Sequence, residues 1–321
     1  MARYVALRVL LLIPILLCVT FIVYALVDMM PGSIADRIIT GDMTDEEIQE
    51  IYELFDLDKP MLWRYGKYLW NLLHGDLGAS QDTGLSVWYL FTSRWMNTVK
   101  LSLFSVALSI VIGIPVGIYA AKHAGTISDN LCTAGTMIFV SMPNFWLGLM
   151  LLTWFCYKVK LFPVTYDGTW KCFVLPVLAG GMAMSASLTR QTRSAILEVS
   201  RQDYLRTARA KGVPERTVTY KHELGNALIP IITNIGGAFS ATLAGSAIIE
   251  EVYSWPGVGY MQVQAIRKRD AVLACGTAVL ITALHTVILL LVDLVYAAVD
   301  PRIKAAYVSK GKKKKQKKVT T

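Results

Sequence analysis

Asp203-Tyr-Leu-Arg-Thr-Ala-Arg-Ala-Lys-Gly-Val-Pro214 is a short basic stretch between two long apolar segments. Ser200 stands three residues before Asp203, which is a capping-box spacing, so we expect a helix to begin there. Gly212 suits the left-handed residue that ends a helix, and Pro214 suits the first turn of the next one. The stretch therefore predicts a helix, a tight corner and a second helix outside the bilayer. A rigid corner of this kind can transmit a push, but on local evidence a polar loop that merely connects spans is the commoner case.

The rest of the chain is rich in clustered apolar residues. It has 321 residues, of which 54% are hydrophobic, and its mean hydropathy is positive. Apolar runs of about 20 residues are long enough to cross a bilayer as helices. The sequence therefore predicts an all-α polytopic membrane protein. The net charge of +9 lies largely beside the apolar runs and in the C-terminal tail, so topology and anionic lipid explain it better than nucleic acid.

Six apolar segments alternate with polar ones. The first, Val9 to Val27, resembles a signal peptide, but it is long for one and no small-x-small cleavage site follows, so we interpret it as an uncleaved span. The third is expected to break near Met142-Pro-Asn144. The other expected spans are residues 98–121, 172–188, 228–249 and 274–299, and the third covers 131–157.

Residues 31–97 form the longest polar section and hold 11 acidic residues against 5 basic ones. Thr44 and Glu47 have the spacing of a capping box, and the apolar spacing after them predicts one amphipathic helix over 48–55 and another over 62–72. An acidic excess is typical of the outer side of a membrane. The section is therefore predicted to be an extracytoplasmic helical insertion after the first span.

The distribution of basic residues predicts the topology. Of the Lys and Arg residues, 20 fall in sections that six spans place with the N-terminus, and 11 fall in sections on the opposite side. By the positive-inside rule, the N- and C-termini are expected in the cytoplasm. Four parts follow: residues 1–30 with the first span, the insertion 31–97, a five-helix core 98–300 that contains a cytoplasmic loop 190–227, and a basic tail 301–321. The lysine run Lys310–Lys318 is interpreted as a solvated end.

Small residues recur at four-residue steps within two spans, which is the pattern of closely packed membrane helices. Gly113-Ile-Pro-Val-Gly117 carries it in the second span, with a proline that allows a kink, and Gly237, Ala241 and Gly245 carry it in the fifth. We expect helix packing at Gly113, Gly117, Gly237 and Gly245. The five cysteines are scattered and the four histidines lack ligand spacing, so neither a disulfide framework nor a metal site is expected.

The chain lacks the motifs of an enzyme. No G-x-x-x-x-G-K-[ST], H-E-x-x-H or G-x-S-x-G pattern occurs, so no catalytic residue and no cofactor of its own are expected. His285 and Asp293 lie about two turns apart in the sixth span, where a helix–helix hydrogen bond is favoured over a proton relay. An ion-coupled secondary transporter using this pair remains an alternative function, and a membrane anchor or receptor is a third. Energy from a separate subunit is the economical inference.

Five motifs, in order and over nearly the whole chain, resemble those of the B-type permease subunit of the dipeptide/oligopeptide/nickel class of ABC importers. They are Phe55-Asp-Leu-Asp-Lys-Pro60, Gly75-Asp-Leu-Gly78, Asp203–Gly212 followed by Asn226-Ala-Leu-Ile-Pro230, Glu250-Glu-Val-Tyr-Ser-Trp-Pro-Gly-Val-Gly259, and Asp293-Leu-Val-Tyr-Ala-Ala-Val-Asp-Pro-Arg302.

The resemblance implies a type I ABC importer permease fold with six transmembrane helices in a bacterial cell membrane. It implies that the chain forms half of a pathway for di- or oligopeptides, nickel or metal–chelator complexes. The implied partners are a homologous second permease, two cytoplasmic ABC ATPase subunits, an extracytoplasmic substrate-binding protein and the lipid bilayer. ATP and Mg would be bound by the ATPase subunits, because this chain has no site for them.

The resemblance also implies two functional segments. The coupling segment (203–212) would dock into the ATPase subunit, and its candidate residues are Asp203, Tyr204, Arg206, Thr207, Ala208, Arg209, Lys211 and Gly212. The hairpin segment (250–259) would meet the binding protein, through Glu250, Glu251, Trp255, Pro256, Gly257 and Gly259. The general Glu-Ala-Ala pattern falls here on Arg206, Thr207 and Ala208, so an ion pair from that glutamate cannot be carried over. A second departure is Gly225, where the class often has arginine.

Overall fold

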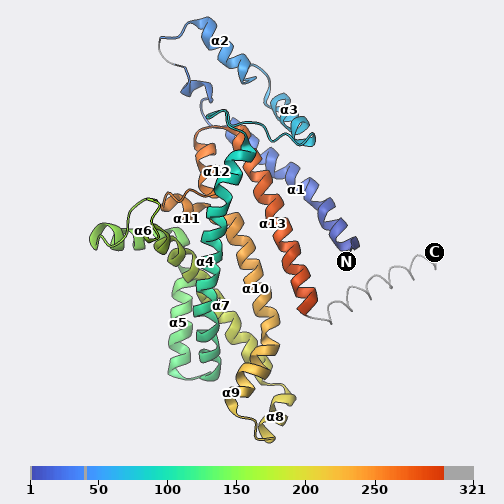
Figure 1. Cartoon of the computed structure of the whole chain (residues 1–321), viewed down its shortest axis with the longest axis vertical. Helices are drawn as coiled ribbons and strands as arrows, with labels where there is room; N and C mark the ends of the chain where they lie inside the picture. Colours follow the sequence, from blue (N-terminus) through green and yellow to red (C-terminus); the bar gives the residue numbers. More distant parts are fainter. Residues whose placement is uncertain (1, 40–41, 300–321) are drawn as a thin grey trace, which may run out of the picture. The chain divides into compact units, whose positions relative to one another are not determined.

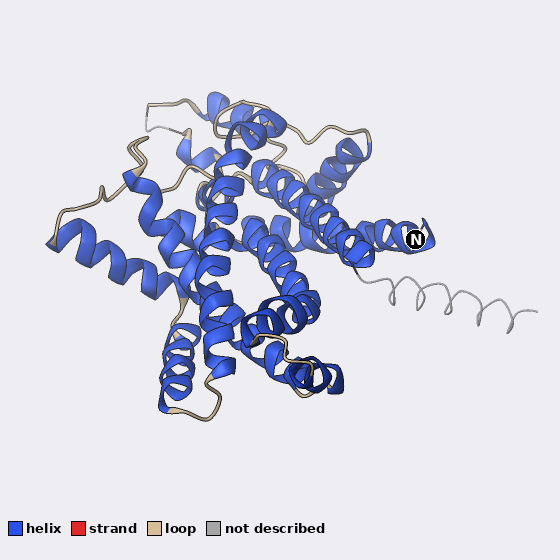
Figure 2. Ribbon diagram, turned by 60° about the horizontal axis from the view of Figure 1, so that its bottom comes forward, coloured by secondary structure: helices blue, strands red, loops and turns tan. Residues whose placement is uncertain are grey.

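The computed structural model describes residues 2–39 and 42–299 (Figure 1). Figure 2 shows helices joined by loops, and within the described residues the only β pairing is an isolated bridge between Ala79 and Ser86, which confirms the all-α prediction. The helices are α1 (Ala2–Asp28), η1 (Ala35–Arg37), α2 (Asp45–Leu54), α3 (Met61–Leu73), α4 (Val87–Lys122), α5 (Ile127–Ser141), α6 (Asn144–Leu152), the π-helix η2 (Thr153–Lys158), α7 (Lys171–Ser200), α8 (Asp203–Ala210), α9 (Glu215–Thr217), the π-helix η3 (Val218–Glu223), α10 (Leu224–Gly245), α11 (Ala247–Val252), α12 (Val258–Arg267) and α13 (Ala271–Val299).

The predicted spans appear as long apolar helices. Among the described residues, five segments are long and apolar enough to cross a membrane: Leu10–Asp28, Val87–Lys122, Lys171–Ser200, Glu215–Leu243 and Ala271–Val292. A sixth span exists if α5 and α6 with η2 count as one, although the chain bends by 94° between them. The bend falls at Met142 and Pro143, where the sequence predicts a break, because proline cannot supply the backbone N–H that would continue α5.

The described chain forms two compact units. One comprises residues 101–243 and 287–299, and the other comprises residues 2–100 and 244–286. The first unit holds α5 to α9 with most of α4 and α10, and contains the coupling segment. The second unit holds α1 to α3, α11 and α12, and contains the hairpin segment. The lysine run Lys310–Lys318 lies outside the described residues.

In the first unit, α4 and α7 approach closely at glycines. A Cβ atom on Gly113 would lie 2.9 Å from the Leu188 Cβ atom, and one on Gly117 would lie 2.6 Å from the Thr192 Cβ atom and 2.7 Å from the Thr189 carbonyl oxygen. Separations this short cannot be accommodated without moving backbone. The pair of glycines therefore brings the two helices into contact, which is how small residues act in membrane helix packing.

The second glycine pair behaves differently. A Cβ atom on Gly237 would meet nothing within 4 Å, so the described part of the chain supplies no packing partner at this position. The close approach in α10 falls instead on its neighbour Gly236, where a Cβ atom would lie 2.4 Å from a methyl carbon of Val292. One residue turns the contact by about 100° around the helix, and hydropathy alone does not fix that rotation. Gly245 ends α10, and its surroundings lie outside the part of the chain that the structure describes.

Replacing Gly117 with alanine is expected to destabilise the first unit by about 1–3 kcal/mol, the usual consequence of overpacking. The reason is the clash of the new methyl group with the Thr189 backbone. Thermal unfolding of the purified transporter measures this loss of stability. Gly237→Ala is the matched control, because its methyl group enters open space, and equal losses from both variants would show that the contact is unimportant.

An apolar core lies in the described part of the second unit. It joins α1, α3, the start of α4, α12 and α13, and its buried members are Tyr24, Val27, Tyr65, Tyr68, Val87, Leu90, Phe91, Val258, Met261, Ala265, Ala271, Leu273, Ala274 and Cys275. The expected capping box is present on α2, where Thr44 accepts from the Glu47 backbone N–H and the Glu47 side chain accepts from the Thr44 backbone N–H. That arrangement satisfies two donors that a helix N-terminus otherwise leaves unpaired.

Candidate functional site

The coupling segment forms the predicted helix and corner. It is α8, and Gly212 follows it with φ +76°. The Gly212 N–H donates to the Arg209 carbonyl oxygen at 2.9 Å, and the Val213 N–H donates to the Ala208 carbonyl oxygen at 3.2 Å. These two bonds define a Schellman motif, in which glycine is favoured because it adopts a positive φ without strain. Pro214 directly precedes α9, so the corner lies between the end of α8 and the start of α9.

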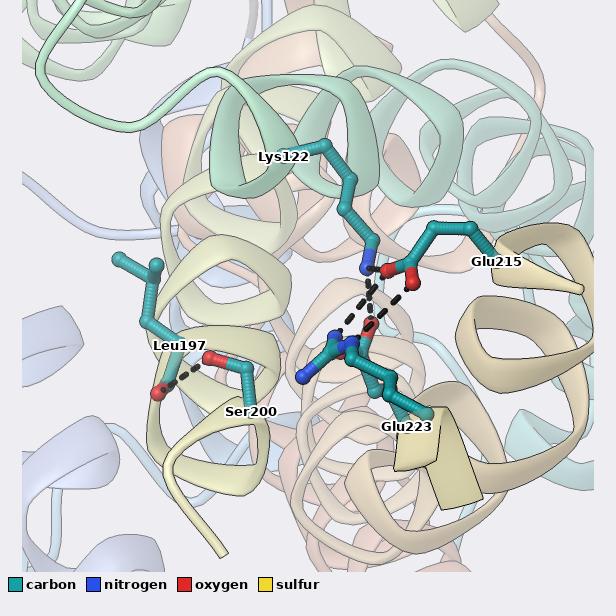
Figure 3. A network of polar contacts seen from close by, with 6 residues as sticks. Lys122, Leu197, Ser200, Glu215 and Glu223 are labelled. Atoms are coloured by element: carbon teal, nitrogen blue, oxygen red, sulfur yellow. Dashed lines mark hydrogen bonds and ion pairs between the residues drawn. The ribbon is translucent and has the colours of Figure 1, made fainter. Parts of the chain in front are cut away.

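The expected role of Ser200 is wrong. The Ser200 hydroxyl donates to the Leu197 carbonyl oxygen at 2.9 Å, within the last turn of α7 (Figure 3). The residue before α8 is Gln202, whose side chain makes no capping bond. A serine near a helix end can bond either forwards to a new helix or backwards to its own, and the spacing alone does not distinguish the two.

A closed set of four charges holds the corner, and we name it the charge network: Lys122, Arg209, Glu215 and Glu223. The Lys122 Nζ atom lies 2.9 Å from Glu215 Oε1 and 2.6 Å from Glu223 Oε2 (Figure 3). The Arg209 Nη2 atom lies 3.1 Å from Glu215 Oε1 and 2.9 Å from Glu223 Oε1. Glu223 is fully buried. Each carboxylate thus meets both cations, and α8 is tied to the end of α4 and to η3.

The network changes the interpretation of the coupling segment. The sequence suggests Arg209 as a charge available to a partner, but the structure commits it to Glu215 and Glu223. Leu205, which is absent from the candidate residues above, is fully buried and holds the inner face of α8 in place. Besides Arg209, the exposed side chains of the segment are those of Asp203, Tyr204, Arg206, Thr207, Ala210 and Lys211. The side chains of Arg206 and Asp203 form an ion pair at 4.0 Å, and such an exposed pair contributes little.

Gly212→Val is expected to impair transport and substrate-stimulated ATPase activity while membrane insertion stays intact. A β-branched residue at positive φ costs about 1–2 kcal/mol, and no clash adds to it because a Cβ atom there meets nothing within 4 Å. Uptake and ATP hydrolysis in proteoliposomes that contain the assembled transporter measure the effect. Gly212→Asn should retain most activity, because asparagine tolerates this conformation, and normal uptake by a well-inserted valine variant would count against the coupling role.

The hairpin segment is organised around the buried Glu250. Its Oε1 atom accepts from the Thr98 hydroxyl at 2.7 Å and from the Ser246 hydroxyl at 2.8 Å. Its Oε2 atom accepts from the Tyr260 N–H at 2.9 Å. The Thr98 hydroxyl oxygen in turn accepts from the Val258 N–H at 2.9 Å. The carboxylate therefore connects α4, α11 and α12.

Other residues of the hairpin segment also point inwards. The Trp255 indole N–H donates to the Asn97 carbonyl oxygen at 3.1 Å, and the ring is buried. A Cβ atom on Gly257 would lie 2.4 Å from the Glu250 carboxylate, and one on Gly259 would lie 2.6 Å from the Ala247 Cα atom. These four residues hold the hairpin together, and their expected contact with a binding protein stays a prediction.

Two expected hairpin residues keep exposed surface. Glu251 and Pro256 are half-buried, and Glu251 pairs with Arg267 at 2.8 Å. A docking protein would reach the hairpin through them.

The alternative ion-coupling pair lies on α13. His285 is half-buried, and the Asp293 side chain lies outside the described part of the chain. Within the described residues, no group of three or more His, Cys, Asp or Glu side chains could hold a metal ion.

The chain matches two family models. One is described as "Binding-protein-dependent transport system inner membrane component" and matches residues 113–305. The other is described as "Binding-prot-dependent transport system membrane comp, N-term" and matches residues 1–102. Together they include both functional segments and the insertion.

Curated relatives match almost end to end. The glutathione transport system permease protein GsiC of Escherichia coli (strain K12) is 35% identical over 305 residues, which is 95% of this chain and 99% of the relative. The dipeptide transport system permease protein DppB of the same strain is 33% identical over 337 residues, again 95% and 99%.

Solved structures share the fold. The inward-facing MetNI methionine ABC transporter superposes with a TM-score of 0.56 at 20% identity, over 66% of this chain and 97% of that chain. An amino acid ABC transporter with histidines gives a TM-score of 0.51 at 17% identity, over 66% and 94%. The type I importer permease fold is therefore present, in a multi-pass protein of the inner membrane. The chain belongs to the family of binding-protein-dependent transport system inner-membrane components, the permease subunits of ABC importers.

Proposed function

We propose that this permease carries short peptides, and that a separate ATPase drives it through α8. The observation that carries the proposal is the rigid corner: α8 ends in a Schellman motif and is held by the charge network to α4 and η3. A force applied to α8 would reach these helices without being absorbed by a flexible loop. The names of the two relatives, which refer to glutathione and dipeptides, support the substrate class.

The contact with the ATPase subunit would be made by the exposed face of α8. That face carries Asp203, Tyr204, Arg206, Thr207 and Lys211, and it lacks the glutamate of the general pattern. It therefore offers two cations and one carboxylate around a tyrosine. Docking would depend on shape and on a weakly basic surface, since Arg209 is occupied by the charge network.

The proposed mechanism also requires partner subunits and a defined orientation in the membrane. A second, homologous permease would complete the pathway as a heterodimer, and two ATPase subunits would bind ATP and Mg. A substrate-binding protein would approach α2, Glu251 and Pro256. The N- and C-termini would lie in the cytoplasm, as the distribution of basic residues predicts. This chain would perform no covalent chemistry.

Reconstitution tests the proposal. The assembled transporter with its binding protein, in proteoliposomes, should take up a labelled dipeptide or glutathione only with ATP, and a nickel–chelator complex should not compete. Arg206→Glu, at a side chain that is 80% exposed, should reduce ATP-driven uptake several-fold. Arg216→Glu on α9 is the matched control for a change of charge nearby. Uptake by this chain alone, driven by an ion gradient, would contradict the proposal in favour of an ion-coupled transporter.

A further inference from the structure

Helix α3 has an unusual composition for a helix in a polar insertion. Its sequence, MLWRYGKYLWNLL, holds two charged residues in 13, Arg64 and Lys67. Its polar side chains, Arg64, Lys67 and Asn71, gather on one side, and apolar side chains cover the rest of its surface. A helix with so wide an apolar surface is normally either packed against protein or placed at a membrane interface. The neighbouring α2 (DEEIQEIYEL) is acidic and has no buried residue, as expected for a helix in water.

One face of α3 is seated on α1. The Tyr65 hydroxyl donates to the Leu17 carbonyl oxygen at 3.1 Å and lies 3.0 Å from the Thr20 hydroxyl oxygen. The Tyr65 ring meets Phe21 at 5.4 Å and Tyr24 at 5.6 Å between ring centroids. Tyr65 is buried by these contacts, which place α3 beside α1 (Figure 1).

These contacts fix the depth of α3 along α1. The apolar part of α1 ends at Asp28, where Arg64 reaches back to pair with that carboxylate at 2.6 Å. The ring contacts to Phe21 and Tyr24 fall four to seven residues before Asp28, or about 6–11 Å of helix. An amphipathic helix in the membrane interface lies about 5–10 Å into the boundary between headgroups and acyl chains. The distance of these ring contacts from the end of the span thus matches the depth of an interfacial helix.

The face of α3 turned away from α1 is exposed and apolar. Leu62 is 69% exposed, Trp70 is 65% exposed and Leu73 is 81% exposed. Their spacing of eight and three residues places them on one side of a helix. At the same level, the α1 side chains of Ile22 and Leu26 are also exposed, as expected for a lipid-facing span. Lipid that covers α1 at this level would also cover α3.

The charged groups of α3 are compatible with this position. Arg64 is paired with Asp28, and Lys67 is paired with Asp56 and lies over the Trp63 ring, 5.4 Å from its centroid. Long basic side chains near a membrane boundary place their amines towards the water, and tryptophan prefers the same zone.

We propose that α3 lies in the interfacial layer of the leaflet at the Asp28 end of α1, with Leu62, Trp70 and Leu73 covered by lipid acyl chains. The insertion is then divided into a lipid-facing helix, α3, and a water-facing helix, α2. Only α2 and the loops around it remain available to a soluble partner.

Spin labelling of the assembled transporter in nanodiscs tests the inference. Single cysteines at Leu62, Leu73, Ile22 and Glu50 are introduced after the native cysteines are replaced, and each carries a nitroxide. We expect the labels on α3 to be relaxed by oxygen like the label at Ile22, and to be several-fold less accessible to a water-soluble nickel chelate than the label at Glu50. Each variant is checked for ATP-driven uptake, so that a misfolded protein is not counted.

Two results would overturn the inference. Nickel accessibility at Leu62 and Leu73 equal to that at Glu50 would place α3 in water. Protection from both oxygen and nickel would place a protein partner on it. A second measurement uses tryptophan fluorescence with brominated lipids, where Trp70→Phe should remove more of the quenching than Trp255→Phe, because Trp255 is buried. Equal losses would contradict the lipid contact. None of these readouts depends on the transported substrate or on ATPase docking.

Discussion

Replacing Glu223 with glutamine is expected to release α8 and to uncouple transport. The buried carboxylate balances Lys122 and Arg209, and its removal leaves two cations facing Glu215 alone. Breaking a buried pair costs about 3–5 kcal/mol, and we take about 3 kcal/mol because both cations keep some exposure. Each 1.4 kcal/mol is a tenfold change in an equilibrium constant, so α8 should open about a hundredfold more often.

Hydrogen–deuterium exchange of the amides of residues 203–212 measures that opening directly, and uptake with the partner subunits measures its consequence. Asp203→Asn is the control, since Asp203 is exposed and makes only a distant pair with Arg206. The double variant Lys122→Gln with Glu223→Gln should lose less than the sum of the two single variants, because the network is removed as a unit. Unchanged exchange in Glu223→Gln would show that the charge network does not hold the corner.

Replacing Glu250 with leucine is expected to prevent the hairpin segment from folding correctly. The change leaves the Thr98 and Ser246 hydroxyls and the Tyr260 N–H without their acceptor. Each buried donor without a partner costs about 1–3 kcal/mol. Limited proteolysis should therefore cut this variant within residues 250–260 faster than the wild type, and binding-protein-dependent uptake should be lost.

The hairpin prediction has two internal comparisons. Glu250→Gln keeps the shape and one accepting oxygen, so it should be cut more slowly than Glu250→Leu. Glu251→Gln alters only a partly exposed pair with Arg267 and should resemble the wild type. If Glu250→Leu is cut no faster than Glu251→Gln, the buried carboxylate is not what holds the hairpin.

The pH dependence of the same group follows from its burial. Burial raises the pKa of the Glu250 carboxyl above its ordinary value of 4.5, and the hydrogen bonds from Thr98 and Tyr260 only partly oppose this. The folded state then binds the proton more tightly than the unfolded chain, so this stabilising contribution is complete below pH 4.5 and is lost as the pH rises through the raised pKa. The unfolding temperature of the wild type, relative to that of Glu250→Gln, should therefore fall as the pH rises. A difference that does not depend on pH would contradict this prediction.

Hydropathy and helix signals predicted most of the fold, because they act locally. The apolar runs located the spans, Pro143 located the break between α5 and α6, and the capping box of Thr44 began α2. The errors concern which neighbour a side chain bonds to and which face of a helix makes a contact. Ser200 bonds backwards and not forwards, and the close approach on α10 uses Gly236 and not Gly237. Both depend on which neighbour lies beside the helix, which the sequence does not state.

The sequence predicted the helix and the corner of the coupling segment but not the contacts that hold them, and its docking role stays a prediction. Gly212 marked the end of α8, and the apolar Leu205 among polar neighbours was the available sign of its inner face. The partners of Arg209 are Glu215 and Glu223, which also pair with Lys122, and only tertiary structure brings these four residues together. The family resemblance pointed to Glu250 as a docking residue, and that role stays a prediction, but the sequence did not show that its carboxylate is buried. The glycines that crowd it were the signal that it is enclosed.

The hydrogen bond of the Thr20 hydroxyl affects how the first span can enter the membrane during synthesis. It donates to the Leu16 carbonyl oxygen at 2.7 Å, within its own helix, and so is satisfied before any other part of the chain exists. Tyr65, which later contacts it, is synthesised 45 residues afterwards, or about 2–9 s at typical rates of translation. The first span can therefore enter the membrane alone with the Thr20 hydroxyl already paired, and α3 can pack against it later.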